Sequence, residues 1–297
     1  MSDDYLTVGL GNGVTLRPYT LADESDVLRL VDADRLPGQP EPNRHMLGEA
    51  LHGRSPVDTD WWADLQGLAT QVAVNAAGDV VGVVSYAVRA KGDTGDILWL
   101  HCREDEATAD ALIRHAVAEL APRRVEAFQF ASALSLGLEA LPVRHRPATA
   151  RALEGAGFAG ERLWRYMRAD LPAHTLPRLS HVDMGPDPRG ENARRLEARR
   201  GGRVVAEAVV GVPVQGTGVL WWIEVAPEAR GHGIGRAVLG SALDVLAGLG
   251  AREVILYVDD DAPPGDDRDR TAANSLYDSS GFEEIDRLYS YRLSGPS

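Results

Sequence analysis

Residues 219–239 read VLWWIEVAPEARGHGIGRAVL, an apolar segment followed by a glycine-rich turn and a second apolar segment. The part up to Val225 is rich in β-branched and aromatic residues, which favour a strand. From Ile234 onward the apolar residues recur every three to four positions, which predicts a helix that packs on that strand. The stretch therefore predicts a strand, a tight turn and a helix in direct succession.

The turn has the composition of an anion-binding site. The first backbone N–H groups of a helix have no intrahelical acceptor, and the aligned peptide dipoles leave partial positive charge there. Glycines without a Cβ let the backbone come close to phosphate oxygens, and two arginines add charge. The predicted phosphate-binding residues are Arg230, Gly231, His232, Gly233, Ile234, Gly235 and Arg236.

Two spaced motifs resemble those of the GNAT acyltransferases. The turn RGHGIG at 230–235 is similar to the coenzyme A signature of that family, R/Q-x-x-G-x-G/A. Residues 269–282, DRTAANSLYDSSGF, resemble its closing helix, D-N-x-x-A-x-x-L-Y-x-x-x-G-F, with Arg270 in place of the family's Asn. A single glycine-rich turn is weak support because many folds use one, whereas two motifs in the right order are specific.

Composition limits the other possibilities. The chain has 297 residues, 44% of them hydrophobic and 25% charged, as in globular proteins of one or two domains. A formal net charge of −13 argues against nucleic acid as a partner and would attract a cationic acceptor, or it serves solubility only. The lone Cys102 excludes an internal disulfide, and no spacing of ligands predicts a metal. Apolar runs too short for a bilayer and the absence of a signal sequence predict a cytoplasmic protein.

The sequence also contains an internal repeat. Residues 72–84 (VAVNAAGDVVGVV) and 196–208 (LEARRGGRVVAEA) both have the layout of a β-hairpin. The offset between the halves is 124 positions at both ends of the repeat and 123 in its middle, as shown by the pairs Gly78 and Gly202, Gly157-Phe158 and Gly281-Phe282, and Trp99 and Trp222. Because features present in both halves serve the fold, we expect Trp222 to be a core residue like Trp99.

We therefore predict an α/β (α+β) fold of two tandem GNAT-like units, each a mixed, mostly antiparallel sheet flanked by helices. The predicted ranges are 1–172 for a degenerate N-terminal unit, 173–192 for a linker rich in Pro and Gly, and 193–297 for a C-terminal unit with the acetyl-CoA site. Only the first unit has an opening strand, at 14–18, and helix, at 22–34. We expect it to donate part of the wall of the acceptor pocket.

The first half lacks a phosphate-binding turn. Its segment 101–107 (HCREDEA) is shorter, has no glycine, and presents Glu104, Asp105 and Glu106 where phosphates would lie. These carboxylates would repel an anionic cofactor. The counterpart of Tyr277 is Leu153, which cannot transfer a proton. We predict a catalytically inactive first half and an active second half.

The resemblance implies transfer of an acyl group, most often acetyl, from its coenzyme A thioester to an amine. It places the extended arm of acetyl-CoA along 220–225, against the backbone of Ile223 and Val225, and makes Tyr277 the general acid. Plain packing beside Phe282 is the alternative for Tyr277. Glu224 is a candidate general base, directly or through water, although a strand bulge could turn it to either face.

Two further groups of residues are weaker candidates. Trp61 and Trp62, with His45, His52 and Arg54, lie where an acceptor pocket would be lined, and core packing is the alternative for the tryptophans. The acidic run Asp259, Asp260, Asp261, Asp266, Asp267 and Asp269 reads best as a solvated loop.

The leading hypothesis is an acetyl-CoA-dependent N-acetyltransferase that acts on a small-molecule amine by direct transfer, as a monomer or homodimer. A degenerate first half is similar to the arrangement in the mycothiol synthases of this superfamily. The alternatives are a non-catalytic protein that binds and senses acyl-CoA, and an O-acyl or longer-acyl transferase.

Overall fold

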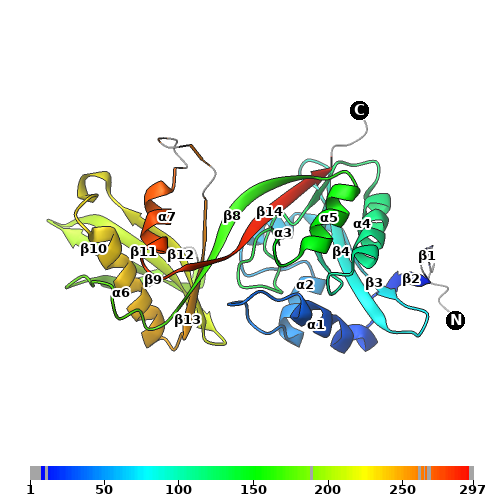
Figure 1. The fold of residues 1–297 in the computed structure, drawn as a ribbon, viewed down its shortest axis with the longest axis horizontal. Coiled ribbons are helices and arrows are strands. Elements are labelled where there is room, and N and C mark those ends of the chain that lie inside the picture. Colours follow the sequence, from blue (N-terminus) through cyan, green and yellow to red (C-terminus); the bar gives the residue numbers. More distant parts are fainter. Residues whose placement is uncertain are drawn as a thin grey trace. The chain divides into compact units, whose positions relative to one another are not determined.

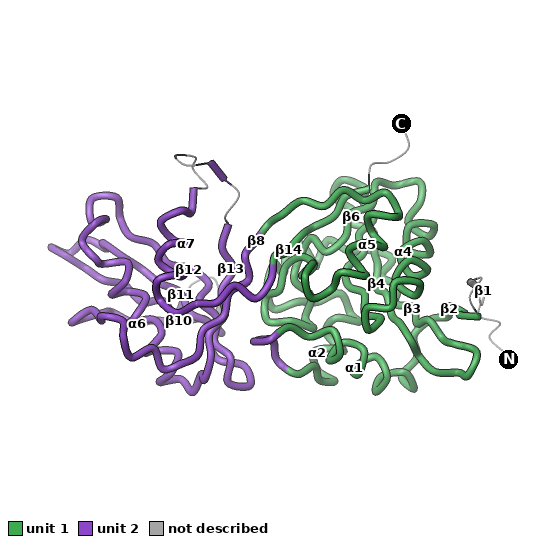
Figure 2. The backbone as a smooth tube through the Cα atoms, in the orientation of Figure 1, with its two compact units in different colours: residues 1–36, 41–163, 287–297 green, residues 37–40, 164–286 purple. Residues whose placement is uncertain are grey.

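The computed structural model describes residues 8–10, 13–187, 190–259, 262–263, 265 and 269–293. The chain divides into two compact units (Figure 2). Unit 1 comprises residues 1–36, 41–163 and 287–297, and unit 2 comprises residues 37–40 and 164–286. Each unit is a mixed, mostly antiparallel sheet flanked by helices, which confirms the predicted fold class (Figure 1).

The sheet of unit 1 has the strand order β1-β2-β3-β4-β5-β6-β14, with β7 beside β14. All of these pairs are antiparallel except β5–β6, which is parallel. The strands are β1 (Val8–Leu10), β2 (Val14–Pro18), β3 (Leu65–Val74), β4 (Val80–Arg89), β5 (Thr94–His101), β6 (Val125–Ala127), β7 (Leu141–Pro142) and the end of β14 (Glu283–Leu293).

Helices cover both faces of this sheet. Residues of α4 and α5 share one core with the strands, and residues of α1 and α2 share a second core that includes Trp62 and Trp99. The helices are η1 (Leu21–Asp23), α1 (Glu24–Ala33), α2 (Arg44–Leu51), α3 (Thr59–Ala63), α4 (Glu106–Leu120) and α5 (Pro147–Gly155).

The sheet of unit 2 has the order β8-β13-β12-β11-β10-β9, and only β12–β13 is parallel. The core of unit 2 lies on the face of the sheet that α6 and α7 cover. The elements are β8 (Ala159–Asp170), β9 (Asp183–Asp187), β10 (Gly190–Arg200), β11 (Arg203–Val214), β12 (Thr217–Val225), η2 (Pro227–Ala229), α6 (Ile234–Gly248), β13 (Glu253–Val258) and α7 (Thr271–Asp278). Among the described residues, no helix combines the length and apolar character needed to cross a membrane.

The two units repeat the same central motif down to a strand irregularity. The pairing of β4 with β5 skips Leu98, so that Ser85 lies opposite Trp99 and Tyr86 opposite Ile97. The pairing of β11 with β12 skips Trp221 in the same way, and Val209 lies opposite Trp222. Trp99 and Trp222 are therefore true counterparts, as the repeat predicted.

The expectation that Trp222 is a core residue is wrong. Trp222 is 41% exposed, whereas Trp99 is 3% exposed. The difference arises from the helices that cover the sheet. Trp99 shares a core with residues of α1 and α2, whereas the described part of unit 2 has no counterpart of those helices. The missing opening helices were predicted, but their consequence for the facing tryptophan was not.

The chain passes between the units within β8 and again within β14, since each of these strands contributes residues to both. Residues 37–40, which follow α1, also belong to unit 2. Residues 171–182 contain no helix or strand, whereas β9 and the start of β10 lie inside the predicted linker. The division into domains at 1–172 and 193–297 stays a prediction.

Candidate active site

The glycine-rich turn forms an open N-terminus for α6. Gly231 and Gly233 have φ angles of 77° and 76°, in the left-handed region that favours glycine. A Cβ built on either residue would meet no atom within 4 Å, so the turn is accessible. The N-cap residue of α6 is Gly233, and no side chain of the described residues caps the helix.

The backbone amides of this turn are free to bind an anion. The first helical hydrogen bond runs from the Ala237 N–H to the Gly233 carbonyl at 3.1 Å. The N–H groups of residues 231–236 have no acceptor among the described residues. The Arg230 Nε donates to the Val225 carbonyl at 2.9 Å and the exposed Arg236 Nη1 to the Ser279 carbonyl at 3.3 Å, which holds both cations beside the turn. Unsatisfied amides at a helix N-terminus with two flanking guanidinium groups fit a diphosphate.

The strand that leads into the turn has an open edge. β12 pairs with β13 only from Thr217 to Val219, opposite Glu253 to Ile255. Beyond that point β12 continues to Val225 and β13 to Val258 without further pairing between them. The half-buried side chains of Ile223 and Val225 pack on the core of unit 2, so an extended ligand would meet their backbone rather than their side chains.

Tyr277 lies on α7 on the same side of the sheet as α6. It is 6% exposed and packs edge-on against Phe282, with ring centroids 5.5 Å apart. Burial raises the pKa of its hydroxyl well above the usual 10, so the group keeps its proton at neutral pH. The hydroxyl makes no hydrogen bond to a described residue. Tyr277 can therefore serve as a proton donor but not as a base at neutral pH.

Arg165 fixes the position of α7 and was not singled out in the sequence. Its guanidinium donates to the Asn274 Oδ1 at 2.5 Å, the Asp278 Oδ1 at 2.9 Å and the Glu284 Oε2 at 2.6 Å. Arg165 is 9% exposed, and these contacts tie the helix that carries Tyr277 to β8 and β14. No local sequence motif indicates the role of Arg165, because its partners are more than 100 positions away along the chain.

Glu224 lies on the opposite face of the sheet from Tyr277. The bulge at Trp221 sets the parity of β12, so Ile223 and Val225 face the core while Trp222 and Glu224 face away from α6. Glu224 is exposed and lies directly opposite Glu207 of β11. The structure thus resolves the orientation that the sequence left open. Tyr277 and Glu224 thus lie on opposite faces of the sheet, whose strands β12 and β13 stop pairing after Val219.

The segment before α7 is described only in part. Asp269 precedes Arg270, the N-cap residue of α7, and its carboxylate accepts from the Thr271 N–H at 2.9 Å and the Gly265 N–H at 2.8 Å. Its hydrogen bonds to Thr271 and Gly265 lower the pKa of Asp269 to about 2. Asp260, Asp261, Asp266 and Asp267 of the predicted acidic loop lie outside the described residues.

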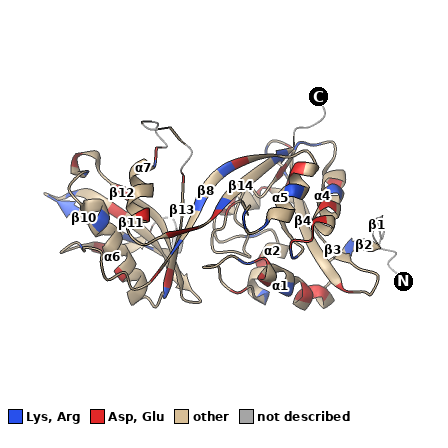
Figure 3. Cartoon of the chain, in the orientation of Figure 1, with Lys and Arg blue, Asp and Glu red and all other residues tan. Residues whose placement is uncertain are grey.

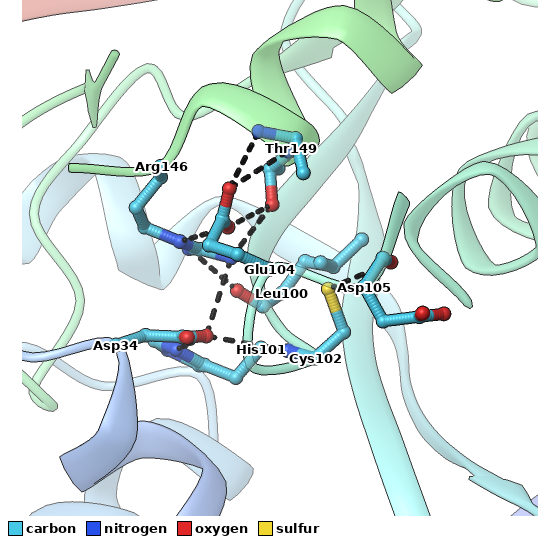
Figure 4. Close-up of polar contacts among 9 residues, drawn as sticks. Asp34, Leu100, His101, Cys102, Glu104, Asp105, Arg146 and Thr149 are labelled. Atoms are coloured by element: carbon cyan, nitrogen blue, oxygen red, sulfur yellow. Dashed lines mark hydrogen bonds and ion pairs between the residues drawn. The ribbon is translucent and has the colours of Figure 1, made fainter. Parts of the chain in front are cut away.

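In unit 1 the N-termini of α4 and α5 are closed by internal carboxylates, and Figure 4 shows the one at α5. The Glu104 Oε2 accepts from the Ala148 N–H at 2.7 Å and the Thr149 N–H at 3.1 Å, which caps α5. The Asp105 Oδ1 accepts from the Thr108 N–H at 2.8 Å, which caps α4. Two of the three acidic residues predicted to repel phosphate thus occupy the anion positions themselves.

A buried arginine completes this arrangement. Arg146, 4% exposed, donates from Nη1 to the Leu100 carbonyl at 2.8 Å, and Leu100 is the counterpart of Ile223. The same guanidinium donates to the Glu104 Oε1 at 3.0 Å and lies 3.4 Å from the Asp34 Oδ2. Asp34 also accepts from the His101 Nδ1 at 3.1 Å. We call Asp34, His101, Glu104, Arg146 and Thr149 the Arg146 network.

The Arg146 network keeps the carboxylate of Asp34 charged. Burial raises the pKa of Asp34, but the hydrogen bond from His101 and the charge of Arg146 outweigh it, and the pKa is lowered overall. Burial lowers the pKa of His101, which therefore donates as a neutral imidazole at pH 7. Burial also raises the pKa of Cys102 to about 11, so this thiol is an unreactive core residue.

The tryptophans proposed as acceptor-binding residues belong to unit 1. Trp62 is core, and Trp61 stacks on Phe130 at 4.3 Å between ring centroids. The guanidinium of Arg89 lies 6.0 Å from the Trp61 ring, so a cation of the protein already faces this aromatic group.

Comparison with known proteins agrees with this division. Residues 161–282 match the Acetyltransferase (GNAT) family, and this range covers nearly all of unit 2. A mycothiol acetyltransferase of Renibacterium salmoninarum is 38% identical over 79 residues, which are 26% of this chain and only 21% of that protein. The mycothiol acetyltransferase of Pseudarthrobacter chlorophenolicus is 28% identical over 297 aligned residues, covering 92% of this chain and 82% of the relative.

Solved structures share the two-unit fold. A tandem GNAT protein from the clavulanic acid biosynthesis pathway superposes with a TM-score of 0.61 at 18% identity, over 96% of this chain and 99% of that one. A GCN5-related N-acetyltransferase from Sphaerobacter thermophilus gives a TM-score of 0.57 at 17% identity, over 97% and 99% of the two chains. At such identities the likeness concerns the fold alone.

The Arg146 network predicts a large stability difference between two arginine substitutions. Arg146→Met would leave the buried carboxylate of Asp34 and the partly buried carboxylate of Glu104 without their cation, which costs about 3–5 kcal/mol of unfolding free energy. Arg151→Met removes only the exposed pair with Glu106 and should cost less than about 0.5 kcal/mol. Urea denaturation followed by circular dichroism measures both, and equal stabilities would refute a structural role for the network.

Proposed function

Residues 161–282 match the Acetyltransferase (GNAT) family, and on this premise we propose that the chain transfers an acetyl group from acetyl-CoA directly to the amine of a small molecule. Unit 2 would carry out the reaction, and unit 1 would serve a structural role. The observation that supports this assignment most strongly is the contrast between the two turns. The amides at the start of α6 lack acceptors among the described residues, whereas carboxylates of the protein cap α4 and α5.

The described residues of unit 2 fit acetyl-CoA. The amides of residues 231–236 and the guanidinium groups of Arg230 and Arg236 would hold the diphosphate. The unpaired edge of β12 from Leu220 to Val225 would bind the extended arm as an added strand binds. When bound, acetyl-CoA supplies the acetyl group as a thioester. The open glycines matter because a side chain at either position would occupy the space next to the amides.

Direct transfer requires two proton movements that the protein can assist. An alkyl ammonium with a pKa near 10 must lose a proton before its nitrogen attacks, and Glu224 would accept it directly or through water. The N–C bond then forms as the C–S bond breaks. Tyr277, which burial keeps protonated, would donate its proton to the departing thiolate, whose pKa is about 8.5, and would regain a proton from the acetylated nitrogen as the amide forms. Overall, the ammonium and the thioester give an amide, a thiol and one released proton.

The role of Tyr277 predicts a loss of turnover without a loss of cofactor affinity. Tyr277→Phe should lower kcat by about 10²–10⁴-fold because the thiolate loses its proton donor. Release of free thiol, detected with DTNB over a panel of amines, gives kcat, and calorimetry gives the Kd for acetyl-CoA. Tyr291→Phe is the matched control, because Tyr291 is also buried but lies in the core of unit 1. Unchanged kcat in Tyr277→Phe would leave Tyr277 a packing residue, and binding of acetyl-CoA without turnover of any amine would favour a sensor.

Substitution of two glycines at opposite ends of α6 tests the proposed phosphate-binding turn. Gly233→Ala places a Cβ at the anion site and should weaken acetyl-CoA binding at least tenfold, by about 1.4 kcal/mol. Gly250→Ala imposes a similar backbone strain, since Gly250 has φ 94° and also no atom within 4 Å of its Cβ, but it lies away from the site. Both variants should lose about 1–2 kcal/mol of stability, and only the first should lose affinity. Equal affinities measured by calorimetry would contradict the proposed phosphate-binding turn.

A further inference from the structure

The face of the unit 2 sheet that lies opposite α6 bears an unusual set of exposed side chains. It presents Trp222, 41% exposed, and Glu224 two residues later on the same strand. On the corresponding face of unit 1, Trp99 is buried with residues of α1 and α2, and the counterpart of Glu224 is His101, bonded to Asp34. The exposed pair is therefore specific to the unit that carries the proposed active site.

Two carboxylates meet on this face. Glu207 of β11 lies directly opposite Glu224 of β12 in the antiparallel pairing. Side chains at such positions share a face with Cβ atoms about 4.5–5.5 Å apart, and like charges there are destabilising. In unit 1 the same two positions hold Val83 and His101. The arrangement in unit 2 is unfavourable unless a cation lies between or above the two carboxylates.

Glu197, Glu207 and Glu224 form a row across β10, β11 and β12. The protein supplies positive charge near Glu197 and Glu207, at the outer part of this row, but not near Glu224 at its inner end. Glu197 of β10, opposite Glu207, bonds to the Arg199 Nη2 at 2.5 Å. Arg195 lies 3.6 Å from the Glu207 Oε2 and closer, at 3.2 Å, to the fully buried carboxylate of Asp187. Glu224 has no ion pair or hydrogen bond within the described chain. The carboxylate of Glu224 therefore lacks a cation among the described residues, on the same strand as Trp222. Figure 3 marks the acidic segments of the chain in red and the basic segments in blue.

Aromatic residues and a short loop border this face. Trp221, the bulged residue, stacks with Tyr257 of β13 at 6.4 Å between ring centroids. The hydroxyl of Tyr257 accepts from the Gln39 Nε2 at 3.2 Å, and Gln39 is 6% exposed. Gly38, at φ 82°, has no room for a Cβ beside Ile255 and Tyr166. The loop at 37–40 is thus seated on unit 2, to which it belongs.

On the basis of the proposed function, we propose that this face binds the acceptor and that the acceptor carries two positive charges. Glu224 receives the ammonium that is to be acetylated, at the edge where β12 leaves β13. Glu207 holds a second cationic group of the same molecule, and the ring of Trp222 lies beside it to favour a cation further. The substrate class is a diamine or polyamine, or a small molecule with two amino groups. Its charge complements the inner end of the row, where Glu224 has no cation among the described residues and Glu207 shares Arg195 with Asp187.

Glu207 is a specificity-determining residue in this proposal, which a comparison of two amines tests. The full-length protein is assayed for thiol release with acetyl-CoA and either 1,4-diaminobutane or butylamine. We expect kcat/KM for the diamine to exceed that for the monoamine at least tenfold, through KM. Glu207→Gln should reduce this preference at least tenfold. Glu197→Gln is the matched control on the same row, where Arg199 already balances the charge, and it should leave the preference unchanged.

Three outcomes would overturn the proposal. One is an equal kcat/KM for 1,4-diaminobutane and butylamine in the wild type. Another is an unchanged preference for the diamine in Glu207→Gln, and the third is an equal effect of Glu207→Gln and Glu197→Gln on that preference. Turnover of butylamine with no advantage for the diamine would refute the dicationic acceptor and leave the proposed acetyltransferase intact. Calorimetry of 1,4-diaminobutane against the protein saturated with CoA gives a readout independent of turnover. Thiol release that fails with every amine, while Glu207→Gln weakens diamine binding, would reject the reaction and retain the cation site.

Discussion

The unsatisfied backbone amides at the start of a helix are the constraint on which both halves of this protein depend. Such groups need an acceptor, and the dipole of the helix makes that acceptor an anion. Unit 1 provides the anion from its own chain, with Asp105 on α4 and Glu104 on α5. Unit 2 leaves the amides of residues 231–236 without an acceptor among the described residues, so this turn is open to an anion from a ligand.

The same contrast extends from the helix ends to the rest of each unit. In unit 1, Arg146 bonds to the carbonyl of Leu100 and is held by the carboxylates of Asp34 and Glu104, so side chains of the unit itself fill the edge of β5. In unit 2, the counterpart edge of β12 beyond Val219 stays unpaired with β13. The sheet face beyond it is also uncovered, which leaves Trp222 and Glu224 exposed. One fold therefore occurs twice, once closed by its own side chains and once open to ligands.

Sequence alone predicted the features that depend on local chemistry and on spacing. The glycine turn, the helix after it and the repeat with its matched tryptophans could be recognised because neighbouring residues determine them. The exposure of Trp222 was mispredicted, since it depends on helices that are distant in sequence. The exchange of chain within β8 and β14 was missed because a strand's pattern does not name its partner strand. The Arg146 network and Arg165 were invisible because their partners lie far along the chain.

Hydrogen–deuterium exchange with and without acetyl-CoA tests the central claim most directly. Amides that lack an internal acceptor exchange quickly, and binding of a diphosphate would slow them. The account predicts that saturating acetyl-CoA slows exchange of peptides covering residues 230–237 and leaves those covering residues 102–108 unchanged. Protection confined to residues 102–108, or no protection in either turn, would contradict it.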